Sequence, residues 1–329
     1  MKQYVIIITL ISTLLGGSSC KEWLKVDSED RIMEDALFQS ESGFFTALNG
    51  VYVHLLNTNL YGRTLTAGTF DILAQYYDTT KPLNSHTYRS LANFELQAKK
   101  DAVADTWKEA YFLIANINTI LEHCENDRSV LSESNYELIK GECLALRAML
   151  HFEMFRIFGP IYSYEPGKVC IPYSDDTEKN VKPLLSAIDV VDKILTDLNQ
   201  AENLLLNVDP VITKGPQSSA EGNNRLRYRN LRLNYFAVQA LTARVYLYAG
   251  NTTEAGRYAR KVISGASKFF PFATREQVNG QAATGTVNRE AEDRIFSSEV
   301  LFGAYNTQDL PIYMTSCFLI NWNLKTSLQ

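Results

Sequence analysis

Residues from about 136 to 158 carry apolar side chains at the spacing of an α-helix, in two stripes on nearly opposite sides. The first stripe contains Ile139, Cys143, Leu146, Leu150, Met154 and Ile157, and the second contains Leu144, Ala148, Phe152 and Phe155. Two narrow polar seams separate the stripes: Lys140, Arg147 and His151 on one side, and Glu142, Glu153 and Arg156 on the other. A surface helix buries a single stripe, so two stripes predict a helix packed on both sides. Gly159 and Pro160 should end it, because glycine favours a left-handed cap and proline cannot continue the helix.

Other stretches show the same helical period, at about residues 41–55, 102–121, 187–205 and 227–265. The first three follow residues whose side-chain oxygens can cap a helix: Ser40, Asp101 and Ser186. In the last stretch, Gly250 and Asn251 should stop one helix and start another. Ala243, Tyr246, Ala255 and Ala259 have the small-aromatic-small spacing of a tetratricopeptide hairpin. The pattern therefore predicts a mainly α fold.

Three long stretches, residues 57–100, 161–183 and 209–224, lack this period. The first is rich in Tyr, Thr, Asn and Gly. A connection of that length in a compact domain is usually functional or disordered, and its aromatic residues argue against disorder. The second stretch contains several prolines, so we expect it to be an extended linker.

Composition excludes one class of partner. The chain has 329 residues, 46% of them hydrophobic and 21% charged, which is ordinary for a globular protein. Its formal net charge of -5 argues against nucleic acid, which requires a basic face. Arg225, Arg227, Arg229 and Arg232 form one basic cluster. We expect this cluster to pack against carboxylates of the same chain.

The first residues have the features of a secretory signal. Lys2 precedes an apolar run of about twelve residues, which is within the range of a signal peptide and too short to span a bilayer. Small residues then precede Cys20, an arrangement similar to the lipobox of bacterial lipoproteins. We expect residues 1–19 to be a lipoprotein signal peptide, Cys20 to carry the lipid, and residues 20–40 to be a lipidated tether. The acyl chains would anchor the protein to a membrane without crossing it.

Known catalytic and metal-binding patterns are missing from the sequence. It has no GxSxG, HExxH, Walker or GxGxxG motif, and we predict that the protein is not an enzyme and needs no cofactor. Four histidines are scattered and should be hydrogen-bonded packing residues: His54, His86, His123 and His151. The neighbouring carboxylates of Asp175 and Asp176 should point apart, unlike a glycosidase pair.

The remaining cysteines also lack the spacing of a zinc site, so we predict no metal. Cys124 ends one helix and Cys143 lies two turns into the next. Given a rise of 1.5 Å per residue, an antiparallel hairpin would place them about 12 Å apart along the axis. We expect Cys124, Cys143, Cys170 and Cys317 to be buried free thiols.

Three motifs resemble the SusD/RagB family of Bacteroidetes surface lipoproteins. The run GECLALRAMLHFEMFRIFG is similar to the family signature at Glu142, Arg147, Ala148, Phe152 and Gly159. The run ALNGVY matches at Leu48, Asn49, Gly50 and Tyr52. The third motif matches at Arg229, Ala240, Leu241, Ala243, Arg244, Val245, Tyr246, Leu247, Tyr248 and Gly250. The resemblance implies a solenoid of tetratricopeptide-like helical pairs with long irregular loops. It assigns residues 41–265 to the N-terminal helical domain and residues 266–329 to the start of a C-terminal region. Relatives continue for well over a hundred residues, so we expect a short or truncated member.

The resemblance also implies a function. Family members lie on the outer membrane, facing the exterior, and deliver oligosaccharide as a hinged lid over a SusC-like TonB-dependent transporter. Capture of peptides instead of glycans is an alternative within the family. A helical-repeat scaffold that binds only protein is an alternative from another class, because repeat folds often serve that role.

Sugars have flat C–H faces and dense hydroxyls, so their sites combine aromatic faces with polar side chains. The first long loop supplies this mixture in Tyr76, Tyr77, Asp78, Asn84, His86, Tyr88 and Arg89. The resemblance places a second group of contacts after the last repeat, for which Tyr305, Tyr313 and Trp322 are the candidates. These residues would equally serve to anchor loops on the helical core.

Overall fold

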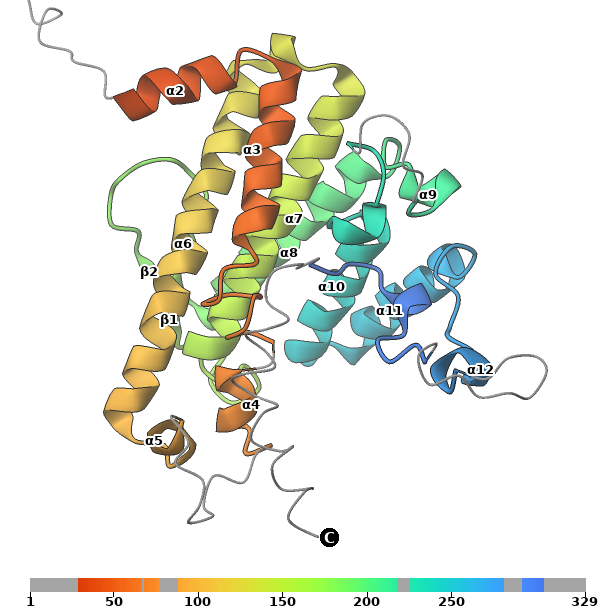
Figure 1. Ribbon diagram of the computed structural model, residues 1–329. Coiled ribbons are helices and arrows are strands. Elements are labelled where there is room, and N and C mark those ends of the chain that lie inside the picture. Colours follow the sequence, from red (N-terminus) through yellow and green to blue (C-terminus); the bar gives the residue numbers. More distant parts are fainter. Residues whose placement is uncertain (1–28, 67, 77–87, 218–224, 281–291, 305–329) are drawn as a thin grey trace, which may run out of the picture.

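The computed structural model describes residues 29–66, 68–76, 88–217, 225–280 and 292–304 (Figure 1). Long helices form most of this part of the chain: α2 (Glu29–Leu37), α3 (Glu41–His54), α6 (Leu96–Asn126), α7 (Glu133–Phe158), α8 (Ala187–Leu205), α10 (Tyr235–Tyr248) and α11 (Thr252–Ala266). Short helical turns connect them: α4 (Thr69–Leu73), α5 (Arg89–Ala92), η1 (Arg128–Val130), α9 (Val211–Lys214), η2 (Arg229–Leu231), α12 (Arg275–Val278) and η4 (Ser297–Glu299). The prediction of a mainly α fold is confirmed.

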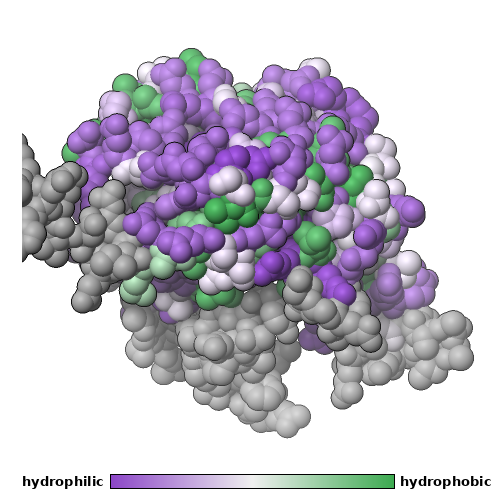
Figure 2. Space-filling view, turned by 90° about the horizontal axis from the view of Figure 1, so that it is seen from above, coloured by the Kyte–Doolittle hydropathy of each residue, from purple (hydrophilic) through white to green (hydrophobic). Residues whose placement is uncertain are grey.

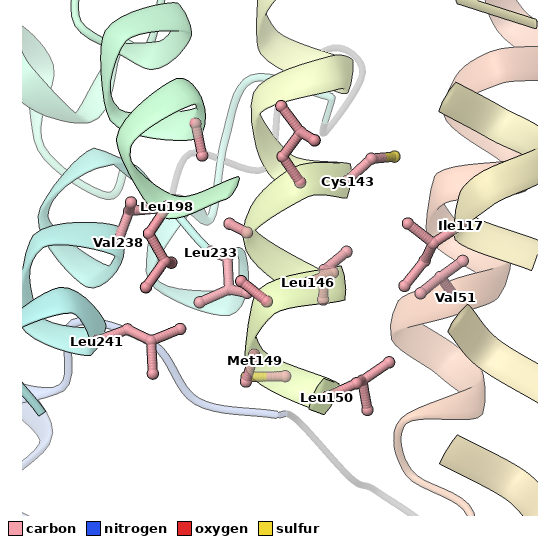
Figure 3. Close-up of a cluster of buried hydrophobic side chains, with 14 of the residues drawn as sticks. Val51, Ile117, Cys143, Leu146, Met149, Leu150, Leu198, Leu233, Val238 and Leu241 are labelled. Atoms are coloured by element: carbon pink, nitrogen blue, oxygen red, sulfur yellow. The ribbon is translucent and has the colours of Figure 1, made fainter. Parts of the chain in front are cut away.

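Helix α7 lies at the centre of the core. On one side it packs against α6 and α3, and on the other against α8 and α10 (Figure 1). Figure 3 shows Ile117 and Val51 facing α7 from one side, and Leu198, Val238 and Leu241 facing it from the other. Every residue from 141 to 155 is buried, which confirms that this helix is packed on both sides.

Gly159 ends α7, but for a different reason from the one expected. Its φ of -80° and ψ of 168° are extended and not left-handed. A Cβ atom at this position would lie 2.4 Å from the carbonyl oxygen of Phe155. Glycine is therefore required here for close approach of the chain to the last turn of the helix.

Side-chain caps confirm most of the expected helix starts. Ser40 accepts from the amide of Gly43, Ser186 from that of Asp189, and Asn251 from that of Glu254. The expected start at Asp101 is wrong, because α6 begins at Leu96 and runs through it. There the side chain of Asp101 accepts a hydrogen bond from Gln97 on the preceding turn.

The stretches without helical period contain more order than the sequence indicates. Residues 57–100 include α4 and α5, and part of the expected tether forms α2. The expected linker 161–183 contains β1 (Val169–Pro172), which pairs antiparallel with β2 (Leu184–Ser186). Its register joins Val169 to Ser186 and Pro172 to Leu184. Pro172 is tolerated because β1 is an edge strand of this two-stranded sheet.

Helices α10 and α11 form the expected hairpin. Gly250 joins them with a φ of 79°, and Tyr246 stacks on Tyr258 with ring centroids 5.7 Å apart. The hairpin packs on α8 through α10 and so extends the layer on that side of α7. Seen from above, the described surface is largely hydrophilic, with scattered hydrophobic patches (Figure 2).

Candidate functional site

The first predicted loop includes α4 and α5, which share a small hydrophobic core distinct from the main core. Ile72 of α4 is buried against Leu91 and Ala92 of α5. The side-chain amide of Gln75 donates to the carbonyl of Ala92 over 2.9 Å, and so fastens the end of α4 to α5. Residues 76 and 88, which bracket the central part of the loop, are therefore held by one local unit.

Aromatic and aliphatic side chains project from this unit into solvent. Tyr76 is 77% exposed. Phe94 and Leu96, at the start of α6, are also exposed. Both Gln75 and Phe94 have a positive φ, of 62° and 59°, which turns the chain sharply on either side of the unit. We call Tyr76, Phe94 and Leu96 with α4 and α5 the aromatic platform.

The platform is tied to the main core through the turns after α3. Leu60 is fully buried there, and Thr106 of α6 donates to the carbonyl of Asn59 over 2.9 Å. Tyr61 is a hydrogen-bond partner of Glu153 on α7. The pKa of Tyr61 is raised well above its usual value, mainly by burial and next by the negative charge of Glu153. The turns that lead from α3 toward α4 are thus held against α6 and α7.

The structure describes only some of the candidates from the sequence. Tyr76 lies on the platform, Tyr88 is half-buried against its core, and Arg89 begins α5. The others lie outside the described residues: Cys20, Tyr77, Asp78, Asn84, His86, Tyr305, Tyr313 and Trp322. Phe94 was missed in the sequence, since it lies where the period was already lost.

The segment that leads toward the second group of candidates is fastened to α3 and α10. Asn234 is fully buried, caps α10, and donates to the carbonyl of Leu301 over 2.6 Å. The amide of Gly303 donates to the carbonyl of Asn230, and Phe302 contacts the ring of Tyr52. Tyr52 is close to the end of α3, from which the chain runs toward the platform.

The polar seams of α7 become two buried networks that hold this frame together. In the first, Arg229 donates to Glu142 over 2.6 Å and to Asp209 over 2.9 and 3.0 Å. Tyr52 also donates to Glu142, over 2.7 Å, and burial together with that charge raises the pKa of Tyr52. The network joins α3, α7, η2 and the turn after α8.

The second network lies on the other seam. Arg147 donates to both carboxylate oxygens of Asp197, over 2.7 and 2.8 Å, and Tyr173 donates to the same group. His151 lies between the carbonyl of Arg147 and the amide of Ser174, and its ring stacks on Tyr173 at 3.8 Å. Burial lowers the pKa of His151 to about 3. These hydrogen bonds hold Tyr173 and Ser174, which follow β1, against α7 and α8.

The expectation for the basic cluster is confirmed for Arg229, whose partners are carboxylates. Arg225 and Arg232 also donate to neutral groups on α3, the hydroxyl of Ser42 and the amide oxygen of Asn49, and the charge of Arg225 helps to lower the pKa of Glu41. Their guanidinium groups also lie over the rings of Phe45 and Tyr52. The cluster therefore packs the chain before α10 against α3.

The described histidines and cysteines are packing residues, as expected. His54 and His123 contact carboxylates, while His151 bonds to the backbone. Cys124 and Cys143 are buried free thiols, whereas Cys170 is free but only half-buried. Asp175 pairs with Lys193 and Asp176 with Lys182, so the two carboxylates are held by different lysines. Among the described residues, no group of three or more His, Cys, Asp or Glu is arranged to hold a metal ion.

Comparison with known proteins identifies the family. A family profile described as SusD-like, "Starch-binding associating with outer membrane", matches residues 22–222. The chain belongs to the SusD-like family. Two SusD-like proteins of Formosa agariphila are 25% identical over 225 residues and 27% identical over 210 residues. These matches cover 64% and 62% of this chain, and 40% and 39% of the relatives.

Solved structures of the SusD superfamily share the fold. A protein from Bacteroides thetaiotaomicron matches with a TM-score of 0.57 and 21% identity, over 74% of this chain and 50% of its own. A SusD-like carbohydrate-binding protein from Bacteroides vulgatus matches with a TM-score of 0.56 and 21% identity, over 74% and 48%. The chain thus spans about half the length of these structures and two fifths of the curated relatives. The expected tetratricopeptide-like fold is confirmed.

Proposed function

We propose that this protein is a cell-surface lipoprotein that binds oligosaccharide and delivers it to a SusC-like TonB-dependent transporter. Membership of a family described as starch-binding and associated with the outer membrane supports the class of ligand and the location. The observation that carries the proposal is the aromatic platform, where Tyr76 is 77% exposed on a supported base. An exposed aromatic ring on a rigid base can stack on the C–H face of a sugar.

The ligand site that we propose extends from the platform to the other candidates from the sequence. These are Tyr76, Tyr77, Asp78, Asn84, Tyr88 and Arg89 from the first loop, and Tyr305, Tyr313 and Trp322 from the second group. Residues 301–303, which precede the second group in the sequence, are held at α10 and η2, with Phe302 against Tyr52. The protein would act by binding and release, without catalysis.

Attachment to the membrane would come from the N-terminus. We propose that residues 1–19 are removed and that Cys20 is acylated, which holds the protein on the outer face of the outer membrane. No helix in the described ranges is both long and apolar enough to cross a bilayer. We also propose that residues 41–265 form one helical domain and that residues 266–329 begin a further region.

A binding screen tests the function. Purified protein is titrated with maltohexaose, cellohexaose, laminarihexaose and hexaalanine, and Tyr76→Ala is compared with Tyr164→Ala, an exposed tyrosine on the turn after α7. We expect a hexasaccharide to bind and Tyr76→Ala alone to weaken it, by about 3- to 10-fold for one aromatic contact. Binding of hexaalanine alone would support peptide capture. Absence of any bound probe, with co-purification of a protein partner, would support a scaffold.

A further inference from the structure

A second group of aromatic and polar side chains lies on the outer face of α3 and α6, away from the platform. Phe112 of α6 is 53% exposed, and its ring centroid lies 5.1 Å from that of His54 on α3. Phe112 follows Leu96 by sixteen residues on α6. At 1.5 Å per residue, the two are about 24 Å apart along the helix axis.

Polar groups next to this ring are held in fixed positions. His54 Nε2 and Glu109 Oε2 lie 2.7 Å apart, and Asn57 Nδ2 donates to the same oxygen over 3.4 Å. Glu109 Oε1 accepts no hydrogen bond from the described part of the chain, so it can accept one from a ligand. Glu109 and Phe112 thus lie within one turn of α6, and His54 adjoins both of them from α3.

Gly50 leaves part of this face without a side chain. It lies in the interior of α3, one turn before His54, where glycine costs about 0.5–1 kcal/mol relative to alanine. A Cβ atom on Gly50 would meet no atom within 4 Å, and its φ is not in the positive range. Neither packing nor backbone conformation therefore requires glycine here, and the bare backbone leaves space for an external group.

We infer that this face is a second glycan-binding site, which takes a neutral pyranose unit. The sugar would place its C–H face on Phe112 and donate hydroxyl hydrogens to Glu109 and His54. The bare backbone at Gly50 and the exposed side chain of Val53 would form the adjoining floor. The carboxylate of Glu109 disfavours uronic or sulfated sugars, because like charges repel. The inference rests on the proposed glycan binding and adds a subsite to it.

A second site would strengthen binding of long chains more than of short ones. When one segment of a polysaccharide occupies the platform, another segment reaches the α3–α6 face at a high effective concentration. Two weak sites on one rigid helix can thereby hold a long glycan well.

NMR titration with the same three hexasaccharides and hexaalanine tests the inference, reading the Val53 methyl groups and the amides of residues 50–54 and 108–112. In wild type these signals should shift along with those of the platform. Phe112→Ala should abolish the shifts on this face but keep those at residues 69–76, while Tyr76→Ala should do the reverse. Gly50→Ala should weaken binding on this face although it raises Tm, which a purely structural glycine would not do.

The outcomes separate this inference from the proposed function. Shifts confined to the platform overturn the second site and leave the proposed function intact. Shifts on the α3–α6 face that only hexaalanine produces overturn its assignment to sugars. If no hexasaccharide moves any signal of wild type, both proposals fail.

Discussion

Arg229 donates from Nη1 to Glu142 Oε1 over 2.6 Å, although 87 residues separate them in sequence. Their side chains are only 1% and 2% exposed. Asp209 supplies the second carboxylate, so the guanidinium is held between two negative groups. Burial alone would lower the pKa of Arg229, but these carboxylates raise it above its usual value. The pair fixes η2, and thus the start of α10, to the central helix.

Removing Arg229 should be strongly destabilising. Arg229→Met leaves Glu142 and Asp209 buried without their cation, which typically costs about 3–5 kcal/mol. Arg257→Met is the matched control, because Arg257 pairs with Glu254 at the surface and is well exposed. Urea unfolding should show a large fall in midpoint for the first variant and almost none for the second. Equal midpoints would mean that the buried pair contributes nothing net.

Two glycines of α3 should respond in opposite directions to a single methyl group. A Cβ on Gly43 would lie 1.6 Å from the carbonyl oxygen of Leu37, so Gly43→Ala must displace the end of α2. Overpacking of this kind costs about 1–3 kcal/mol. Gly50→Ala meets no atom and should instead stabilise by about 0.5–1 kcal/mol. Thermal melts of both variants check this, and a fall in Tm for Gly50→Ala would contradict it.

His151 should make the protein less stable in mild acid. Its partners are a carbonyl and an amide N–H, which together fit only the neutral ring with its proton on Nδ1. Burial lowers its folded pKa to about 3, while an unfolded histidine titrates near about 6.5. As the pH falls, His151 therefore takes up its proton at a higher pH in the unfolded chain than in the folded chain. This contribution to stability is full above about pH 6.5 and falls by about 1.4 kcal/mol per unit toward pH 3.

His151→Gln provides the comparison, because its amide can still donate and accept but does not titrate. The difference in unfolding free energy between wild type and this variant should decrease as the pH falls from 7.5 to 4.5. Carboxylates that titrate in both proteins cancel in that difference. A difference that stays constant over this range would rule out His151 as the source.

Cys124 and Cys143 should resist alkylation in the native protein. Burial raises the pKa of Cys124 to about 12 and that of Cys143 well above its usual value. The reactive species is the thiolate, so very little of it exists at pH 8. Iodoacetamide followed by peptide mass spectrometry should find both thiols unlabelled until urea is added. Rapid labelling without urea would show that α6 and α7 open locally.

Much of the fold could be predicted from hydrophobic period and capping residues. The two stripes of α7, the Ser40 and Ser186 caps and the Gly250 joint all follow from local rules that act within a turn or two. The start of α6 could not, because Asp101 has the chemistry of a cap but lies in a helix that continues through it. The local preference of Asp for a capping position is weak compared with the packing of the adjoining helical turns.

The site was less predictable than the fold. The sequence identified Tyr76 in an aromatic loop, but not that Gln75 and Ala92 bond to make its base. It also gave no sign that Phe112 lies beside His54, since these residues come from different helices.

By itself, the amino-acid sequence determined the family, the central helix and the polar seams along it, because these depend on residue types at fixed local spacing. The partners of the seam residues depend on the tertiary structure: Glu142 pairs with Arg229, and Arg147 pairs with Asp197. Charge pairs in the core depend on which distant segments fold together. A buried charge requires a partner, but local spacing does not specify which residue supplies it.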